Sequence, residues 1–315
     1  MKRDDIQRIL LETLEKKIPD KTELVEMLMD TLFMEKGAVY RRLRGEVPFN
    51  FYEIAIISEK LNLSLVNLNN DKSKWVDSFA LDATGVDFGK WHDYIALINL
   101  AKKDPLSEFA SSTNHIPGSI HAKYESLYKF FIYKYTYLLR GTESRVPFKD
   151  YILPEELKKI FWSYYQESKF FAKSLFICDP SMIDNLILDL RYFSSIYLLS
   201  RDDMQQIKDD LYSFLDYFEE IAMNGYFDET EMQVDIYISD VNLDGNYNYM
   251  QLNDMKICLV RTFNVNAVMG RDSKSYERIK NWIQALKRTS TLISRSAAVF
   301  RIEFFDRQRA ILSEL

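Results

Sequence analysis

The stretch Glu35-Lys36-Gly37-Ala38-Val39-Tyr40-Arg41-Arg42-Leu43-Arg44-Gly45 restricts the fold of this chain more than any other. Polar and apolar side chains recur along it at helical spacing. Its last residue, Gly45, stands where a helix commonly ends in a left-handed residue. The stretch therefore predicts a short helix over residues 35–44 with basic side chains on its outer face. A helix this short needs neighbours to stabilise it, so the flanking segments must supply a core.

The flanking sequence predicts four more short helices, two of which begin at a capping box. Asp20 with Glu23 and Asn50 with Glu53 have the three-residue spacing at which a polar side chain closes the first turn of a helix. Apolar side chains recur at helical spacing within each segment. The predicted helices cover residues 5–16, 21–32, 50–61 and 62–70. Together with the central helix they form a five-helix domain over residues 1–70.

The remaining residues, 71–315, predict a larger domain that is mainly helical. Its expected linker is the polar stretch Asn69–Ser73. Helices are expected over residues 122–139, 154–177, 181–199, 201–225, 273–287 and 297–312. Alternating patterns over residues 232–238, 247–252 and 256–263 predict three strands. Asp244-Gly245-Asn246 supplies a hairpin turn between the first two strands, so the fold class is mainly α with a small antiparallel β meander.

The composition fits a helical globular protein. The 315 residues include 20 Tyr, 21 Phe and 4 Trp but only 9 Gly and 7 Pro, which favours long helices around bulky cores. No run approaches the ~18 uncharged apolar residues of a membrane span, and no apolar leader follows Met1. Cys178 and Cys258 lie in apolar runs and are expected to be buried free thiols. We expect a cytoplasmic protein that is not attached to a membrane.

No group of residues in the sequence has the spacing of a catalytic or metal centre. His92, His115 and His121 are too scattered for a metal site and are expected in surface or capping roles. The run that begins at Asp240 has part of the spacing of a calcium loop, but Gln251 stands where a bidentate Glu is required. A hairpin turn is favoured there. Because no nucleophile elbow or Walker loop is present, we expect no enzyme activity, no cofactor and no metal.

The helix over residues 35–44 has the properties of a helix that enters the major groove of DNA. It is short, ends sharply and carries Lys36, Arg41, Arg42 and Arg44. Arginine binds both guanine edges and phosphates. The net charge of -6 and the near-neutral balance of residues 1–70 oppose this interpretation. Phosphate attraction depends on the local patch more than on the total charge, and DNA binding is therefore predicted.

Residues 22 to about 68 resemble the Cro/repressor-like helix-turn-helix family, also called the xenobiotic-response-element class. The resemblance rests on Leu24–Leu43, Ala38–Glu46 and Ile54–Leu65. It implies a transcription regulator with Lys21 and Thr22 as phosphate ligands.

The segment Tyr40–Glu46 is also similar to a subgroup of long regulators from Bacteroides-like bacteria. In that subgroup a helical C-terminal region of unknown role follows the DNA-binding domain. Ser290–Ser294 and Arg301–Arg309 are similar to its closing segment. The chain departs from the family at Leu32-Phe33, where the turn between the second and third helices usually has a small residue.

The sequence leaves the register of the helix over residues 35–44 open. The usual spacing would bury Val39 and Arg42, and burying a charge is costly. A shift by one residue would bury Tyr40 and Leu43 instead. We favour an intermediate in which Leu43 is in the core. The residues expected at DNA are then Lys36, Tyr40, Arg41, Arg42 and Arg44.

The expected function is sequence-specific regulation of transcription by a protein bound to double-stranded DNA. A single short helix reads only ~4–5 base pairs, so a homodimer is expected. Residues 71–315 would dimerise or respond to a small-molecule or protein effector. The alternative is a protein-interaction scaffold whose helix-turn-helix no longer binds DNA, which the near-neutral charge of residues 1–70 favours.

Overall fold

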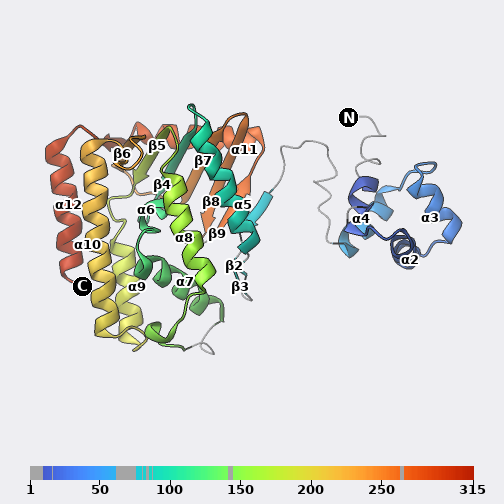
Figure 1. Cartoon of the computed structure of the whole chain (residues 1–315), viewed down its shortest axis with the longest axis horizontal. Coiled ribbons are helices and arrows are strands. Elements are labelled where there is room, and N and C mark those ends of the chain that lie inside the picture. Colours follow the sequence, from blue (N-terminus) through green and yellow to red (C-terminus); the bar gives the residue numbers. More distant parts are fainter. Residues whose placement is uncertain are drawn as a thin grey trace. The chain divides into compact units, whose positions relative to one another are not determined.

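The computed structural model describes residues 10–15, 17–61, 76–79, 81–82, 85–86, 88–140, 145–262 and 266–315. The chain divides into two compact units, Met1–Trp75 and Val76–Leu315 (Figure 1). Each unit has its own hydrophobic core. Within the described ranges, every helix is too short or too polar to cross a bilayer.

The first unit is a small helical bundle. Residues 10–15 and 17 are helical and are followed by α2 (Lys21–Leu32), α3 (Lys36–Leu43) and α4 (Phe51–Lys60). Their inward faces share one core, formed by Leu10, Leu14, Leu24, Val25, Leu28, Val39, Phe49 and Ile57. The fifth predicted helix, over residues 62–70, and the predicted linker lie outside the described residues.

Both predicted N-caps form in the first unit. Asp20 Oδ1 accepts the backbone N–H groups of Thr22 at 2.7 Å and Glu23 at 3.0 Å. At the start of α4, Asn50 Oδ1 accepts the N–H of Glu53 at 2.9 Å, and Glu53 Oε2 accepts the N–H of Asn50 at 3.0 Å. This second pair is a complete capping box, as the spacing predicted.

Helix α3 ends at Gly45, as the sequence predicted. Gly45 has a φ of 74°, a value that costs glycine little because it has no Cβ. Its N–H bonds the carbonyl of Arg42, and the N–H of Glu46 bonds the carbonyl of Arg41, each at 2.9 Å. These two bonds form a Schellman motif, so α3 stops at the predicted place.

The second unit is built on a mixed sheet of eight strands among the described residues. In spatial order the strands are β1 (Val76–Phe79), β9 (Asn266–Gly270), β8 (Met255–Thr262), β7 (Asn246–Leu252), β4 (Glu108–Thr113), β5 (Lys173–Cys178), β6 (Gln233–Ser239) and β10 (Ser290–Leu292). Strands β4, β5 and β6 are parallel, and every other pairing is antiparallel. A separate pair, β2 (Leu81–Asp82) and β3 (Gly85–Val86), is antiparallel.

Helices cover both faces of this sheet. The larger core lies on the face packed against α5 (Phe88–Asn99), α6 (Gly118–His121), α7 (Glu125–Arg140), α8 (Glu155–Ser168), α9 (Asp184–Ser195), α10 (Arg201–Asn224) and α12 (Ala298–Ser313). Helix α11 (Ser273–Lys287) packs on the opposite face. Figure 1 shows α10 and α12 side by side at one end of the sheet. Short 3₁₀ turns cover Leu100–Lys103 and Phe148–Asp150.

The prediction of a mainly α fold with a small meander is wrong, because the second unit has an α/β architecture. Strand β5 was expected to be the end of a helix over residues 154–177. Its apolar run is buried on both sides of the sheet, and such a run has the same composition as a buried helix. Strand β4 was not among the predicted strands, and three of its six residues are Ser or Thr. Of the predicted meander, only the β7–β8 pairing forms, and β6 pairs with β5 instead.

The segment Asp240–Gly245 is not the predicted hairpin turn. Because β5 and β4 lie between β6 and β7, it must cross three strand spacings of ~4.8 Å, or ~14 Å. The backbone of Leu243 is held over the strand ends from both sides. Asp179, which follows β5, accepts its N–H at 2.8 Å, and Asn114, which follows β4, donates to its carbonyl at 3.1 Å.

Candidate functional site

Helix α3 has an apolar inner face and a basic outer face. Val39 is fully buried, while Tyr40 and Leu43 pack at the edge of the core. Successive residues of a helix turn by about 100°, so the opposite face is centred on Gly37, with Arg41 and Arg44 beside it. These three residues are exposed.

Arg42 is held inside the first unit by an ion pair with Glu53. Its Nε donates to Oε2 at 2.9 Å and its Nη2 donates to Oε1 at 2.8 Å. The two side chains are only 16% and 7% exposed. The hydrogen bond with Glu53 raises the pKa of Arg42 above its ordinary value, although burial opposes the shift. The guanidinium is therefore a permanent cation with a fixed carboxylate partner.

This pair settles the register of α3 and corrects two expectations. Val39 and Arg42 both turn inward, which is the arrangement that seemed too costly for a charge. A bidentate carboxylate removes most of that cost. Leu43 packs against the core as expected, but beside Val39. The two expectations that fail are the rejection of the usual register and the outward position of Arg42.

Arg41 and Arg44 remain on the surface of α3. Their side chains are 62% and 60% exposed. Glu46 lies near both, with its carboxylate 3.8 Å from Arg41 Nε and 2.8 Å from Arg44 Nε. Exposed pairs of this kind contribute little to stability, so the two arginines can exchange Glu46 for another anion. Lys36, in the first turn of α3, is also exposed.

Gly37 has no packing reason to be glycine. A Cβ added at this position would meet no atom within 4 Å. Glycine inside a helix is less stable than alanine by about 1 kcal/mol. The first unit therefore carries a residue that lowers helix stability at the centre of the outer face of α3.

The start of α2 is less suited to phosphate than the resemblance implies. Lys21 and Thr22 are both exposed, as a DNA-contacting role requires. The carboxylate of Asp20 already accepts the N–H of Thr22, and backbone hydrogen bonds from Glu23 and Thr22 lower the pKa of Asp20. An anion at this helix end would meet that negative charge, so the lysine ammonium is the more accessible ligand of the two.

The turn between α2 and α3 exposes a large aromatic side chain. Phe33 has a φ of 52° and is 95% exposed. Left-handed backbone is unfavourable for a residue with a side chain of this size. Phe33 therefore combines backbone strain with unshielded apolar surface beside the basic helix.

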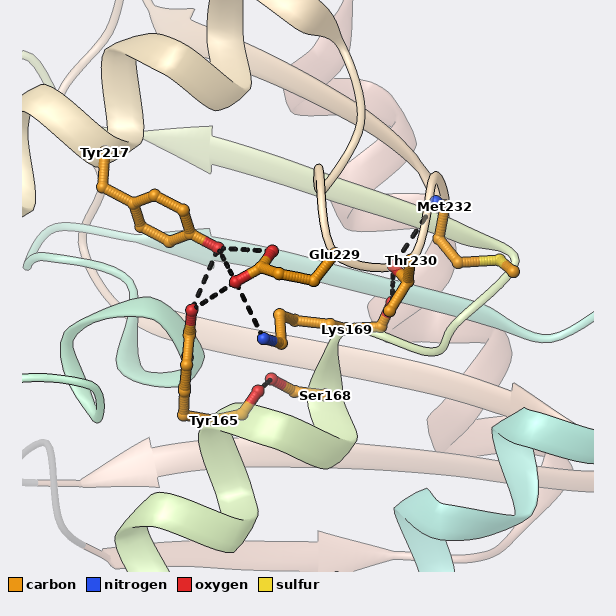
Figure 2. Close-up of polar contacts among 7 residues, drawn as sticks. All are labelled: Tyr165, Ser168, Lys169, Tyr217, Glu229, Thr230 and Met232. Atoms are coloured by element: carbon orange, nitrogen blue, oxygen red, sulfur yellow. Dashed lines mark hydrogen bonds and ion pairs between the residues drawn. The ribbon is translucent and has the colours of Figure 1, made fainter.

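A polar cluster in the second unit joins α8, α10 and the segment before β6 (Figure 2). Glu229 accepts hydrogen bonds from Tyr165 at 2.8 Å and Lys169 at 3.0 Å, and from Tyr217 at 3.2 Å. The Lys169 side chain is only 3% exposed. Its Nζ also lies 4.1 Å from the centre of the Tyr165 ring, which adds a cation–π contact.

This cluster is a structural clamp. Burial raises the pKa of the Tyr165 and Tyr217 phenols, so both remain protonated donors at neutral pH. Burial also raises the pKa of Glu229, but the hydrogen bonds from Lys169 and Tyr165 outweigh it and lower the value to about 2. Lys169 in addition uses its carbonyl to accept the Thr230 hydroxyl at 2.8 Å. Within this cluster, Lys169 and Glu229 neutralise each other and both phenols are protonated. The arrangement therefore does not favour proton transfer.

Sequence reasoning found the basic residues of α3 but missed the partners of the buried charges. The capping-box spacing identified Glu53 as a cap and gave no sign of its contact with Arg42. Lys169 and Glu229 were not identified at all, because 60 residues separate them. The one available signal was Arg42 itself, since a cation at a core position requires a nearby acid.

Comparisons with known proteins give no relative for this chain: no family model, no curated protein and no solved structure matches it. In the described ranges, no three His, Cys, Asp or Glu residues are grouped so that they could hold a metal. Cys178 and Cys258 are free and buried, which confirms their prediction as buried thiols.

Replacing Glu53 with Gln is expected to destabilise the first unit by about 2–3 kcal/mol, because Arg42 would lose a nearly buried carboxylate. Amide hydrogen exchange of α3 and α4 in the full-length protein measures this change. Glu46→Gln is the matched control, since its pairs are exposed and its effect should stay within about 0.5 kcal/mol. Equal protection in the two variants would contradict the structural role of Glu53.

Replacing Glu229 with Gln is expected to destabilise the second unit at pH 7 by roughly 1 kcal/mol, a value reduced for its partial exposure. The carboxylate has a pKa of about 2 in the fold against 4.5 ordinarily. Its contribution is complete above pH 4.5 and is lost as the pH falls towards 2. The two proteins should therefore converge in acid.

Urea unfolding followed by tryptophan fluorescence, to which Trp162 beside the Tyr165 ring contributes, measures this difference at each pH. Asp228→Asn, at the exposed neighbouring position, is the control. A difference between wild type and Glu229→Gln that does not shrink below pH 4 would show that the clamp does not depend on ionised Glu229.

Proposed function

We propose that this protein is a sequence-specific DNA-binding transcription regulator that inserts α3 into the major groove. The observation that carries the proposal is the outer face of α3, where Arg41 and Arg44 flank Gly37. Arginine side chains can bind guanine edges or phosphates. A glycine between them lets the helix backbone approach the bases closely, which gives a reason for a residue that the first unit itself does not require.

The corrected register makes the proposed contact surface smaller than the sequence suggested. It contains Lys36, Arg41 and Arg44 on α3 and Lys21 on α2, with Tyr40 at its edge. Arg42 acts indirectly in this proposal, because its pair with Glu53 fixes which face of α3 is outward. Glu46 would be displaced from the two arginines when DNA binds.

We further propose that the protein acts in the cytoplasm as a homodimer and has no catalytic activity. One short helix contacts too few base pairs for specificity, and a twofold dimer doubles the contacts. The second unit is then responsible for dimerisation, for response to an effector, or for both. The α/β architecture of that unit is compatible with either role.

The test is binding of the purified full-length protein to a genomic fragment library at two salt concentrations, followed by sequencing of the retained DNA. Enrichment of a short inverted repeat, weaker at the higher salt because counterions are released on binding, supports the proposal. If a folded protein retains no sequence at either salt concentration, the proposal is wrong.

The alternative function is a protein-interaction scaffold, and one observation favours it. Phe33 exposes 95% of its surface next to α3, and an exposed aromatic residue is typical of protein–protein contacts. Phe33→Ser would then abolish binding of a protein partner. Under the DNA proposal the same variant should retain its operator affinity.

Replacing Arg41 and Arg44 together with Gln is expected to weaken operator binding by at least tenfold, because each contact to a base is worth about 1–3 kcal/mol. The slope of log K against log salt should also fall by about one for each phosphate that the variant no longer binds. Fluorescence anisotropy at several salt concentrations measures both. The control is Arg278→Gln with Arg307→Gln, which makes the same charge change at exposed positions of α11 and α12. Equal losses of affinity in the two variants would show a general charge effect only.

Replacing Gly37 with Ala is expected to raise the stability of the first unit by about 0.5–1 kcal/mol while weakening operator binding. The added methyl group has free space inside the protein but would meet DNA at the centre of the contact surface. Hydrogen exchange and anisotropy on the same preparation measure the two effects. A more stable variant with unchanged affinity would show that the α3 backbone does not approach DNA closely.

A further inference from the structure

Six large apolar or aromatic residues of the second unit are exposed around the end of α9. They are between 40% and 91% exposed. Two lie on α9, one follows its end, one lies at the end of α7, and two lie in the segment before α8. We call this group the α9 end surface, and its members are Leu188, Tyr192, Tyr197, Leu138, Val146 and Ile152.

Contacts between α7 and α9 bring the exposed residues of these two helices together (Figure 1). The ring centres of Tyr137 and Phe193 are 5.1 Å apart, and the side chains of Tyr137 and Tyr192 are hydrogen-bonded. Leu138 directly follows Tyr137. Leu188 lies one turn before Tyr192 on the same face of α9, because residues four apart are neighbours on a helix. The outer face of α9 and the end of α7 therefore form one area.

The segment before α8 adjoins the same area. Tyr133 of α7 donates to the carbonyl of Val146 at 2.8 Å, and its ring centre lies 5.3 Å from that of Tyr151. The Tyr133 ring also contacts Phe193 of α9, with the ring centres 5.5 Å apart. Val146 and Ile152 are thereby held beside α7 and α9.

Tyr197 follows α9 in a conformation that favours glycine. Its φ is 61°, and the N–H of Leu198 bonds the carbonyl of Phe193 at 3.0 Å, as in a Schellman motif. Glycine or asparagine is usual at this position, because a larger side chain makes left-handed backbone unfavourable. The Leu198 carbonyl accepts the N–H of Phe148 at 2.8 Å, which places Tyr197 next to the segment before α8. Tyr197 therefore combines backbone strain with an aromatic ring that the unit leaves 91% exposed.

The α9 end surface is large enough for the apolar part of a dimer interface. A large side chain has a surface of roughly 150 Å² or more. At their fractional exposures the six residues therefore present about 600 Å² to solvent, which is the upper end of what a typical monomer exposes in one apolar patch. A stable dimer buries roughly 800 Å² on each partner, of which somewhat more than half is apolar. The α9 end surface supplies that apolar share.

The charges around the α9 end surface suit contact with a second copy of the chain. Lys134 pairs with Asp189, and Arg191 pairs with Glu314, so these charges are neutralised within one copy. The further exposed charges that lie close to its members in the sequence are of both signs: Arg145, Lys149, Asp150, Arg201 and Asp202. Copies with a net charge of -6 repel each other, and this repulsion is weakest where the surface is near neutral.

A second apolar patch, at the end of α10 and the start of α12, is smaller and more acidic. Its exposed residues are Met223, Tyr226, Val299, Phe300 and Ile302. The exposed acids close to them in the sequence outnumber the exposed arginines; the acids are Glu220, Asp228, Glu303 and Asp306, and the arginines are Arg295 and Arg307. Two copies of this patch would bring like charges together, which is unfavourable. The α9 end surface is therefore the better candidate for self-association.

We propose that two copies of this chain associate about a twofold axis through the α9 end surface, with Tyr197 and Ile152 as the main contact residues. This inference rests on the proposed homodimer and names its interface. Tyr197 and Ile152 are the two most exposed members of the surface, and tyrosine is enriched among the residues that dominate binding energy at interfaces. A twofold contact uses the same surface on both copies, so each substitution acts twice.

The test is sedimentation equilibrium of the full-length protein without DNA, from low to high micromolar concentrations, for the wild type and three variants. Tyr197→Asn removes the ring and keeps a residue that tolerates left-handed backbone. Its melting temperature should stay the same or rise, while the dissociation constant of the dimer rises at least tenfold. Ile152→Asp places two like charges at the contact and should weaken the dimer by at least as much.

Phe33→Asn is the matched control. Phe33 has a φ of 52° and is 95% exposed in the first unit, so the substitution makes the same change outside the α9 end surface and should leave the dimer unaffected. A wild type that stays monomeric over the whole concentration range would refute the proposal. So would wild-type dimer affinity in Tyr197→Asn or Ile152→Asp, or an equal loss of affinity in Phe33→Asn.

These measurements separate the interface from the proposed DNA binding. A dimer that Tyr197→Asn and Ile152→Asp both weaken, in a protein that retains no DNA sequence, would support the interface and refute the regulator. A protein that enriches an inverted repeat while its dimer persists in both variants would support the regulator and refute this interface.

Discussion

A cation that is removed from water must be given partners, and this constraint organises both units of the protein. An unpaired buried charge would cost more than the net stability of an ordinary domain can bear. Arg42 receives a bidentate carboxylate, Lys169 receives a carboxylate and an aromatic ring, and Arg261 receives two phenols and an amide. In each case the partners come from other elements of the fold, so the charge ties those elements together.

The three buried cations differ in the partners that surround them. Arg42 and Glu53 neutralise each other, and the consequence is geometric, because the pair decides which side of α3 faces solvent. Lys169 is likewise neutralised by Glu229, which fastens the segment before β6 to α8 and α10. Arg261 donates a hydrogen bond to the Tyr164 hydroxyl and lies beside a small cavity at the strand ends.

The sheet changes direction at β4, and a small cavity lies there. Strand β4 is parallel to β5 on one side and antiparallel to β7 on the other. The connection from β6 to β7 must then cross the ends of β5 and β4, where Asp179 and Asn114 hold its backbone. The strand ends, a common ligand site in parallel sheets, are thus covered by the chain itself. Thr113 and Asn246, at these strand ends, line a small cavity together with Arg261 and Gly118.

Local signals in the sequence determined the parts of this protein that depend on near neighbours. The two helix caps, the end of α3 at Gly45 and the β7–β8 hairpin each involve residues only a few positions apart, and each forms as predicted. Tertiary structure alone decided the rest. Strand β5 was misassigned because a run buried on both faces has no period that distinguishes it from a helix. The register of α3 was open because the cost of burying Arg42 depends on Glu53, in the next helix, and the environment of Arg261 depends on residues from α5, α8 and β7. Such contacts join positions far apart in sequence, and only the folded chain brings them within bonding distance.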